Sequence, residues 1–216
     1  AIDGAVVAPA LDATPRGRAL RDALAARGVP VEAIPDREFG ALASTEQPQG
    51  VLAVVALPQW EAEAVRPLPG HPVLLLDGVQ DPGNVGTIAR TALALGAAGL
   101  VALPGTAELA NPKVVRSAMG ALFRLPAAHL EGATLPGWLR TVGAVLWVAE
   151  TGGEPVASAR AGGPVAIAVG NEGAGVHPEV AALAARRVGI PLAPGAESLN
   201  VAAAAAILLY EVSRGG

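Results

Sequence analysis

The stretch RVGIPLAPGAESLNVAAAAAILLY (Arg187–Tyr210) constrains the fold more than any other part of the chain. It begins with a short apolar run, Val188–Leu192, which indicates the end of a buried strand. A loop with a proline and a glycine follows. The alanine-rich segment Leu199–Leu209 then predicts a helix that is apolar and buried on every side, with Ser198 as its N-cap. A polar loop between a strand and a buried helix suits a small ligand, but an ordinary capped core helix produces the same pattern.

Composition narrows the class of protein. The chain has 216 residues, of which 52% are apolar and 3% aromatic, so we expect one large or two small domains with an Ala, Val and Leu core. It contains no cysteine, which excludes disulfides and thiolate chemistry, and its three histidines are far apart, so we expect no metal site. We find no signal peptide and no apolar run of membrane length, and expect a soluble, cytoplasmic protein without membrane contact. The net charge of −4 argues against general nucleic-acid coating but permits a local basic patch.

Residues 1–57 predict a small α/β unit. We expect strands at Gly4–Pro9, Val29–Ile34 and Gly50–Leu57, and helices at Pro15–Arg27 and at Asp36–Ala43 with Asp36 as its cap. Arg16, Arg18, Arg21 and Arg27 gather on or beside the first helix, either as a phosphate-binding patch or as a solvated face. Residues 58–72 carry four prolines and predict a linker.

A continuous apolar strand, Val73–Asp77, opens the second part of the chain and indicates a sheet that is covered on both faces. The turn GVQDPGNVG follows, and a helix is expected over Asn84–Leu95. Arg90 is the only charged residue between Asp81 and Glu108. An isolated arginine in an apolar helix needs a partner, which is either a structural salt bridge or a ligand.

The same strand–helix pattern then repeats. Strands are expected at Gly99–Leu103, Ala144–Ala149 and Pro164–Val169, a helix at Asn111–Met119 and a glycine-rich loop at Thr151–Gly163. Together they predict a parallel α/β sheet. The last of these strands runs into GNEGAGV (Gly170–Val176), which is either a ligand crevice at a strand end or a tight turn with an exposed Glu172. The dinucleotide, P-loop and α/β-hydrolase motifs are missing.

Three segments, taken together, resemble one known family. They are DGVQDPGNVGTIARTALALGA (Asp77–Ala97), AIAVGNEGAGV (Ala166–Val176) and IPLAPGAESLNVAAAAAILLYE (Ile190–Glu211), and NPKVVRSAMGALF (Asn111–Phe123) resembles the family's intervening segment. Their order and spacing are similar to the motifs of the SpoU/TrmH family of RNA ribose 2′-O-methyltransferases, in the SPOUT superfamily. The resemblance covers about Val73–Arg214.

The resemblance implies a fold and a domain plan. We expect an α/β protein with a parallel sheet and a C-terminal deep trefoil knot, forming a SPOUT methyltransferase domain at residues 73–216. The segment EQPQGVLAVVALP (Glu46–Pro58) looks like the end of an L30e-like substrate-binding domain, here residues 1–57. The chain begins with Ala, and the first helix and strand of that domain are not recognisable, so we expect the domain to be incomplete.

The resemblance also implies a cofactor, S-adenosyl-L-methionine, bound in the knot loops largely through backbone groups, and a homodimer. The cofactor-binding residues carried over are Val169, Gly170, Asn171, Gly173, Ile190, Leu192, Ser198 and Leu199. The family's motif-one arginine is Arg90, whose role we leave open between proton acceptor and positioning group. Asn84, Glu172, Ser198 and Asn200 match the polar positions that would orient ribose, Arg90 and the cofactor loops.

The expected substrate is structured RNA. Members with an L30e-like domain often act on ribosomal RNA, so 23S rRNA is favoured over tRNA. RNA would be held by Arg16, Arg18, Arg21, Lys113 and Arg116, which we expect to share one face with Arg90 in the dimer. Two alternatives stay open: a non-catalytic RNA-binding protein of the same fold, and an α/β enzyme that acts on a small molecule. The chain departs from the common family pattern at Ala202 and at Ser117-Ala118.

Overall fold

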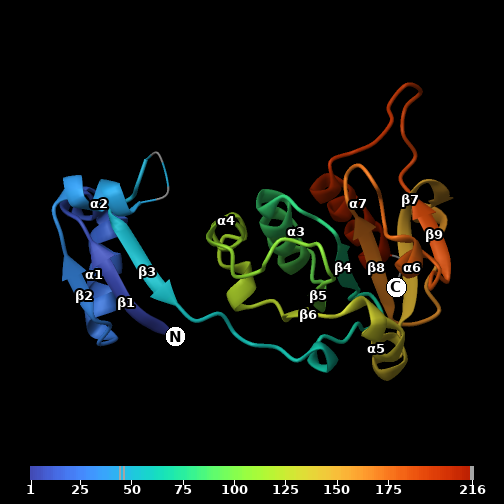
Figure 1. The fold of residues 1–216 in the computed structure, drawn as a ribbon, viewed down its shortest axis with the longest axis horizontal. Helices are drawn as coiled ribbons and strands as arrows, with labels where there is room; N and C mark the ends of the chain where they lie inside the picture. Colours follow the sequence, from blue (N-terminus) through green and yellow to red (C-terminus); the bar gives the residue numbers. More distant parts are fainter. Residues whose placement is uncertain (44, 46, 215–216) are drawn as a thin grey trace. The chain divides into compact units, whose positions relative to one another are not determined.

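The computed structural model describes residues 1–43, 45 and 47–214, so Glu46 of the L30e-like segment lies outside the described residues. The chain divides into two compact units, Ala1–Leu57 and Pro58–Gly216, which are drawn in Figure 1. Among the described residues, no helix is both long and apolar enough to cross a membrane.

The first unit is a three-stranded sheet with the order β2-β1-β3. Strand β1 (Ile2–Val7) pairs parallel with β2 (Val31–Ala33) and antiparallel with β3 (Val51–Val55). The 3₁₀ helix η1 (Pro9–Ala13) and the helices α1 (Pro15–Ala26) and α2 (Asp36–Leu42) complete the unit. The expected cap of α2 is wrong. Asp36 is the first helical residue after Pro35, and its Oδ1 accepts a hydrogen bond at 3.0 Å from the N–H of Ala10.

The second unit contains the predicted parallel sheet, which has six strands in the order β6-β5-β4-β8-β7-β9. The strands are β4 (Val73–Asp77), β5 (Gly99–Ala102), β6 (Ala127–His129), β7 (Val145–Pro155), β8 (Val165–Gly170) and β9 (Arg186–Gly189). The α-helices are α3 (Pro82–Ala94), α4 (Pro112–Ser117), α5 (Leu135–Val142), α6 (Pro178–Ala181) and α7 (Val201–Arg214). Short 3₁₀ helices are η2 (Ala62–Ala64), η3 (Ala121–Phe123), η4 (Gly132–Thr134) and η5 (Val156–Ser158).

Both faces of the sheet are covered, as the continuous apolar strands predict. One face forms a core with α5, in which Val73 and Leu75 of β4 share a cluster with Trp138. Because side chains alternate along a strand, Leu74 and Leu76 point to the other face, where α3 contacts β5 and α7 contacts β8. The carboxyl ends of β4 and β8 lie side by side, with Asp77 opposite Gly170.

The glycine-rich loop expected at Thr151–Gly163 is wrong over its first residues. Strand β7 continues to Pro155 and pairs with β9 through Glu154 and Pro155 after an irregularity. This pairing needs glycine on both strands. A Cβ on Gly189 would lie 2.8 Å from the carbonyl oxygen of Glu150 and 3.0 Å from the backbone nitrogen of Gly153. Two glycines therefore let the backbones approach where the sequence alone suggests a loop.

The C-terminal helix differs from its prediction in two ways. It begins at Val201 and Asn200 caps it, because Asn200 Oδ1 accepts hydrogen bonds from the N–H groups of Ala202 at 2.9 Å and of Ala203 at 3.3 Å. The expected cap, Ser198, lies in the preceding loop. The helix is also buried on one side only, since Ile207 and Tyr210 are 38% and 46% exposed. The sequence does not reveal this amphipathicity, because alanine occurs on both the buried and the exposed face of the helix.

Helices α3 and α4 pack at close range. Gly86 of α3 faces α4, and a Cβ there would lie 2.5 Å from the carbonyl oxygen of Val114 and from the Cβ of Ser117. Backbone atoms cannot move aside as flexible side chains do, so glycine at position 86 determines how close the two helices lie.

We expect Gly86→Ala to reduce the free energy of unfolding of the second unit by about 2 kcal/mol, because the new methyl group overlaps α4. All three tryptophans lie at positions 60, 138 and 147, within the second unit, so denaturation followed by tryptophan fluorescence reports on that unit. Gly137→Ala in α5 is the matched control, since its Cβ would meet only the end of Arg140 at 3.9 Å. Equal stabilities of the two variants would contradict the packing argument.

Candidate active site

A cavity of about 620 Å³ opens at the carboxyl ends of β8 and β9 and beside the middle of β7. It is bordered by the loop after β8, by the loop after β9 and by the first turns of α7. Every residue that the resemblance assigns to the cofactor lines it: Val169, Gly170, Asn171, Gly173, Ile190, Leu192, Ser198 and Leu199. Two loops that are distant in sequence thus meet at one hollow, which is the usual place for a ligand in an open parallel sheet.

The loop after β8 is held tightly by its own backbone. Asn171 and Gly175 exchange two backbone hydrogen bonds of 2.9 and 2.8 Å. The side-chain Oδ1 of Asn171 accepts from the N–H groups of Gly173 at 2.9 Å and of Ala174 at 3.1 Å. A Cβ on Gly170 would lie 2.1 Å from the carbonyl carbon of Gly175. Glycine is therefore required at position 170, and the loop presents backbone groups to the cavity.

Asp77 ties this loop to the central strand. It is the one charged side chain that is buried among the described residues, with 7% exposed. Its Oδ2 accepts a hydrogen bond at 2.6 Å from the backbone N–H of His177, and Asn171 Nδ2 donates to the carbonyl oxygen of Gly78 at 3.1 Å. Both ends of the loop are therefore attached to the end of β4. Asp77 was not predicted as a site residue, although a carboxylate that ends a buried strand was a visible signal.

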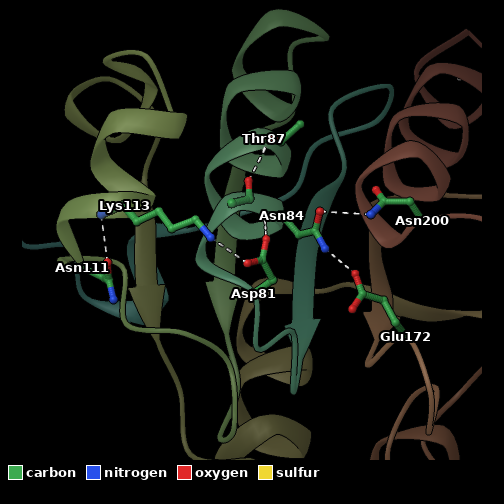
Figure 2. Close-up of polar contacts among 8 residues, drawn as sticks. Asp81, Asn84, Thr87, Asn111, Lys113, Glu172 and Asn200 are labelled. Atoms are coloured by element: carbon green, nitrogen blue, oxygen red, sulfur yellow. Dashed lines mark hydrogen bonds and ion pairs between the residues drawn. The ribbon is translucent and has the colours of Figure 1, made fainter. Parts of the chain in front are cut away.

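Three of the predicted catalytic side chains form one hydrogen-bonded chain (Figure 2). Asn84 lies in the first turn of α3, Glu172 in the loop after β8 and Asn200 at the start of α7. The side-chain amide of Asn84 donates to Glu172 Oε1, and its Oδ1 accepts from Asn200 Nδ2 at 3.1 Å. Because each end of the Asn84 amide has a partner, the orientation of this group is defined.

Asp81 fixes the position of Asn84 through the backbone. It caps α3, with Oδ2 accepting from the N–H of Asn84 at 2.9 Å, and its Oδ1 pairs with Lys113 Nζ at 3.0 Å (Figure 2). The hydrogen bond from Lys113, helped by the N–H of Asn84, lowers the pKa of Asp81 below its usual value. The cap therefore stays ionised at neutral pH. Lys113, predicted to contact RNA, holds the helix of Asn84 in this structure.

The remaining predicted residues lie elsewhere. Ser198 lines the cavity, and no hydrogen bond among the described residues joins it to the Asn84 chain. Exposed Arg90 borders a second hollow between α3 and α7. In the first unit, Arg21 pairs with Asp12 at 3.1 Å and Arg18 donates to the carbonyl oxygen of Asp12, while Arg16 is exposed. Arg116 is exposed on α4. The two groups of basic residues belong to different units, so their common face stays a prediction.

Sequence reasoning missed the β7 side of the cavity. Glu150 and Thr151 line it, and Arg187 Nη1 holds Glu150 Oε2 at 2.7 Å. The signal was present, because Glu150 directly follows the apolar run that predicts this strand. Ala204 and Leu208 of α7 also face the cavity and supply an apolar wall. The cavity therefore combines glycine-rich backbone, an apolar helix face and carboxylates near its edge.

These features match a known family. The model of the SpoU rRNA Methylase family matches residues 71–210, and the model described as RNA 2′-O ribose methyltransferase substrate binding matches residues 3–61. The chain belongs to the SpoU rRNA methylase family. The predicted resemblance is confirmed, and this membership identifies the protein as an RNA ribose 2′-O-methyltransferase.

Individual family members are similar over most of the chain. The 23S rRNA (guanosine(2553)-2′-O)-methyltransferase RlmP of Bacillus subtilis is 37% identical over 86% of this chain and 73% of its own. The AdoMet-bound rRNA methyltransferase from Sinorhizobium meliloti has a TM-score of 0.86 at 30% identity, covering 99% of this chain and 80% of that one. AviRb from Streptomyces viridochromogenes, in complex with AdoMet, has a TM-score of 0.85 at 29% identity, covering 99% and 83%.

We expect Asp77→Ala to weaken S-adenosylmethionine binding about tenfold, because the loop after β8 loses a charge-assisted hydrogen bond that holds its far end. Titration calorimetry measures the affinity. Asp77→Asn keeps an oxygen acceptor at the same place and should lose less. Wild-type affinity in the alanine variant, with unchanged amide exchange at residues 171–177, would show that Asp77 does not hold the loop.

Proposed function

We propose that this protein transfers a methyl group from S-adenosylmethionine to a ribose 2′-hydroxyl of structured ribosomal RNA, with 23S rRNA as the substrate. The observation that carries the proposal is the direct link between the cavity and the Asn84 chain. Glu172 lines the cavity and also accepts the hydrogen bond of Asn84. A cofactor-sized hollow and a set of polar side chains thus share one residue.

The residues of the cavity fit S-adenosylmethionine. Its volume of about 620 Å³ lies in the range of small-molecule sites. Backbone groups at Gly170–Gly173 and Ile190–Leu192 would hold the polar parts, and Ala204 and Leu208 offer apolar contact. The cofactor supplies a methyl group that its sulfonium centre already activates. The protein's own task is therefore to orient the acceptor, where effective-molarity effects amount to roughly 7 kcal/mol or more.

We assign to Arg90 a positioning and charge-stabilising role. A guanidinium stays protonated in proteins, so it cannot accept the proton of the 2′-hydroxyl without a large energetic cost. It can bind a phosphate of the substrate strand through two parallel hydrogen bonds and stabilise an oxygen that becomes negative. Asn84, Glu172 and Asn200 form the polar chain at the start of α3 and would orient the ribose, with Ser198 at the cavity wall.

We further assign residues 1–57 to an L30e-like substrate-binding domain, 58–72 to a linker and 73–216 to a SPOUT methyltransferase domain with a deep trefoil knot. The match of residues 3–61 to a substrate-binding family supports the first assignment. The meeting of the loops after β8 and β9 at one cavity supports the knot. The rRNA-directed bacterial relatives favour rRNA over tRNA and a cytoplasmic location.

We also propose that the enzyme is a homodimer joined through α3 and α7. A hollow of about 540 Å³ lies between these helices. Its lining is mostly apolar: Arg90, Thr91, Ala94, Leu95, Ala206, Ile207, Tyr210 and Glu211. Burying Ile207 and Tyr210 against a second copy would remove apolar surface from water. It would also place Arg90 at the subunit boundary, close to groups of the partner.

The direct test incubates the protein and S-adenosylmethionine separately with unmodified 23S rRNA and with a tRNA pool, followed by nuclease digestion and mass spectrometry. We expect a new 2′-O-methyl nucleoside in the rRNA alone. Arg90→Ala should lower the rate by about 100-fold or more and keep cofactor affinity, whereas Arg90→Lys should retain part of the rate. A product in tRNA alone would overturn the substrate assignment, and an active alanine variant would overturn the role of Arg90.

We expect Ile207→Glu to convert the dimer to a monomer, because a carboxylate in the apolar centre of the interface must lose its hydration. Light scattering coupled to size exclusion measures the molecular mass. Leu183→Glu is the matched control, since Leu183 is 37% exposed and Ile207 38%, but Leu183 does not line the hollow. A wild-type monomer would contradict the proposed dimer directly.

A further inference from the structure

One segment of the second unit carries basic residues and no acidic ones. No acidic residue occurs between Glu108 and Glu131, whereas Lys113, Arg116 and Arg124 all fall there. The chain as a whole has a net charge of −4. Local charge controls which molecules approach a surface more than the total does. Lys113 is paired with Asp81, and Arg116 and Arg124 leave this segment, which comprises α4 and η3, with a net positive charge.

Two large apolar side chains project from the same segment. Met119 follows α4 and is 70% exposed, and Phe123 ends η3 and is 40% exposed. No other large hydrophobic side chain among the described residues is more exposed than Met119. Apolar groups that stay in water within a basic surface are typical of an interaction site rather than of a folded core.

The backbone at Met119 is held in an uncommon conformation. Its φ is +50°, and it is the only non-glycine residue with a positive φ among those described; Gly120, with a φ of +86°, follows it. The left-handed region costs a residue with a Cβ roughly 1 kcal/mol or more. Hydrogen bonds on both sides hold the turn, from the N–H of Ala118 to Val114 and from the N–H of Ala121 to Ala118, each 2.9 Å. Such strain is concentrated at functional sites.

The segment lies next to the Asn84 chain but away from the proposed dimer face. Lys113 contacts Asp81, the cap of α3, and Gly86 of α3 packs against Ser117. Figure 2 shows α3 between the helix that carries Lys113 and the helix that Asn200 caps. Met119 and Phe123 therefore belong to the flank of α3 opposite α7. An RNA whose ribose reaches Asn84 would have neighbouring nucleotides within reach of this flank.

We propose that Met119 and Phe123 form a platform for an unpaired nucleobase of the substrate RNA, next to the nucleotide whose ribose is methylated. The proposal rests on the proposed function. Specific RNA recognition relies on splayed bases that stack on aromatic side chains. Phe123 supplies the stacking face and Met119 a flexible apolar contact. Arg116 and Arg124 supply positive charge for the flanking phosphates.

The charges favour RNA over a second copy of this chain as the occupant. An interface between identical copies around a two-fold axis brings the same patch onto itself. Arg116 and Arg124 would then face like charges in a partly dehydrated interface, which is unfavourable. The hollow between α3 and α7 lacks this problem, because Glu211 lies there with Arg90. The apolar platform and the apolar dimer face therefore have different partners.

The test compares Met119→Gly, Phe123→Ala and their combination with the wild type in steady-state methylation of the 23S rRNA fragment that the wild type modifies. Met119→Gly removes the side chain and suits the positive φ, so its stability should stay or rise, and a defect cannot be attributed to misfolding. Phe123→Tyr preserves the stacking face and should restore activity. Leu68→Ala is the control, since Leu68 is 58% exposed and lies outside the basic segment.

We expect each platform variant to raise KM for RNA about tenfold, or about 1.4 kcal/mol, with the affinity for S-adenosylmethionine unchanged. KM values equal to the wild type would overturn the proposal. A shift from dimer to monomer in the variants would also overturn it, because the platform would then belong to a subunit interface.

If the wild type methylates no rRNA, the proposed function fails and the platform is judged by binding alone. Fluorescence anisotropy then compares a single-stranded and a duplex rRNA fragment. A preference of the wild type for the single strand that the double variant loses supports the platform. Equal binding by both proteins excludes it.

Discussion

The pairing of β4 with β8 is the constraint on which the site depends. These parallel strands lie side by side in the sheet, with Asp77 opposite Gly170. Parallel neighbours end at the same edge, so the loop after β4, which leads to Asn84, meets the loop after β8, which carries Glu172. Segments more than 80 residues apart in sequence are thereby joined by hydrogen bonds from Asn84 to Glu172 and from Asn171 to Gly78.

A site that binds its ligand through backbone groups depends on glycines and short polar side chains more than on chemically reactive side chains. Gly170 has no room for a Cβ, and the amide of Asn171 serves as an internal clamp for its own loop. The side of the site that would receive the ribose is also preorganised, since the Asn84 amide is fixed by hydrogen-bond partners at both ends. Such preorganisation suits a reaction whose methyl donor is already activated, because orientation then supplies a large part of the rate.

These properties explain what the sequence could predict. Continuous apolar strands predicted the parallel sheet correctly, and the motif residues that were assigned to the cofactor line one cavity. The sequence alone did not predict which distant segments contact one another. The extension of β7 depends on Gly153 and Gly189 meeting across two strands, and the cap of α7 depends on which of two polar residues faces the helix. Alanine on both sides of α7 concealed its exposed face, because alanine carries little hydrophobic signal.

The acidic total charge is compatible with an RNA substrate once individual groups are placed. Several cations are neutralised within the protein: Arg21 by Asp12, Arg186 by Glu154 and Arg187 by Glu150. No acidic side chain lies in the segment between Glu108 and Glu131, where Lys113 is paired with Asp81 and Arg116 and Arg124 add positive charge. Screening limits exposed charges to an effective range of about 10 Å. An RNA strand near α4 would respond to the positive charge of this segment, and the net charge of the whole chain would act on it only weakly.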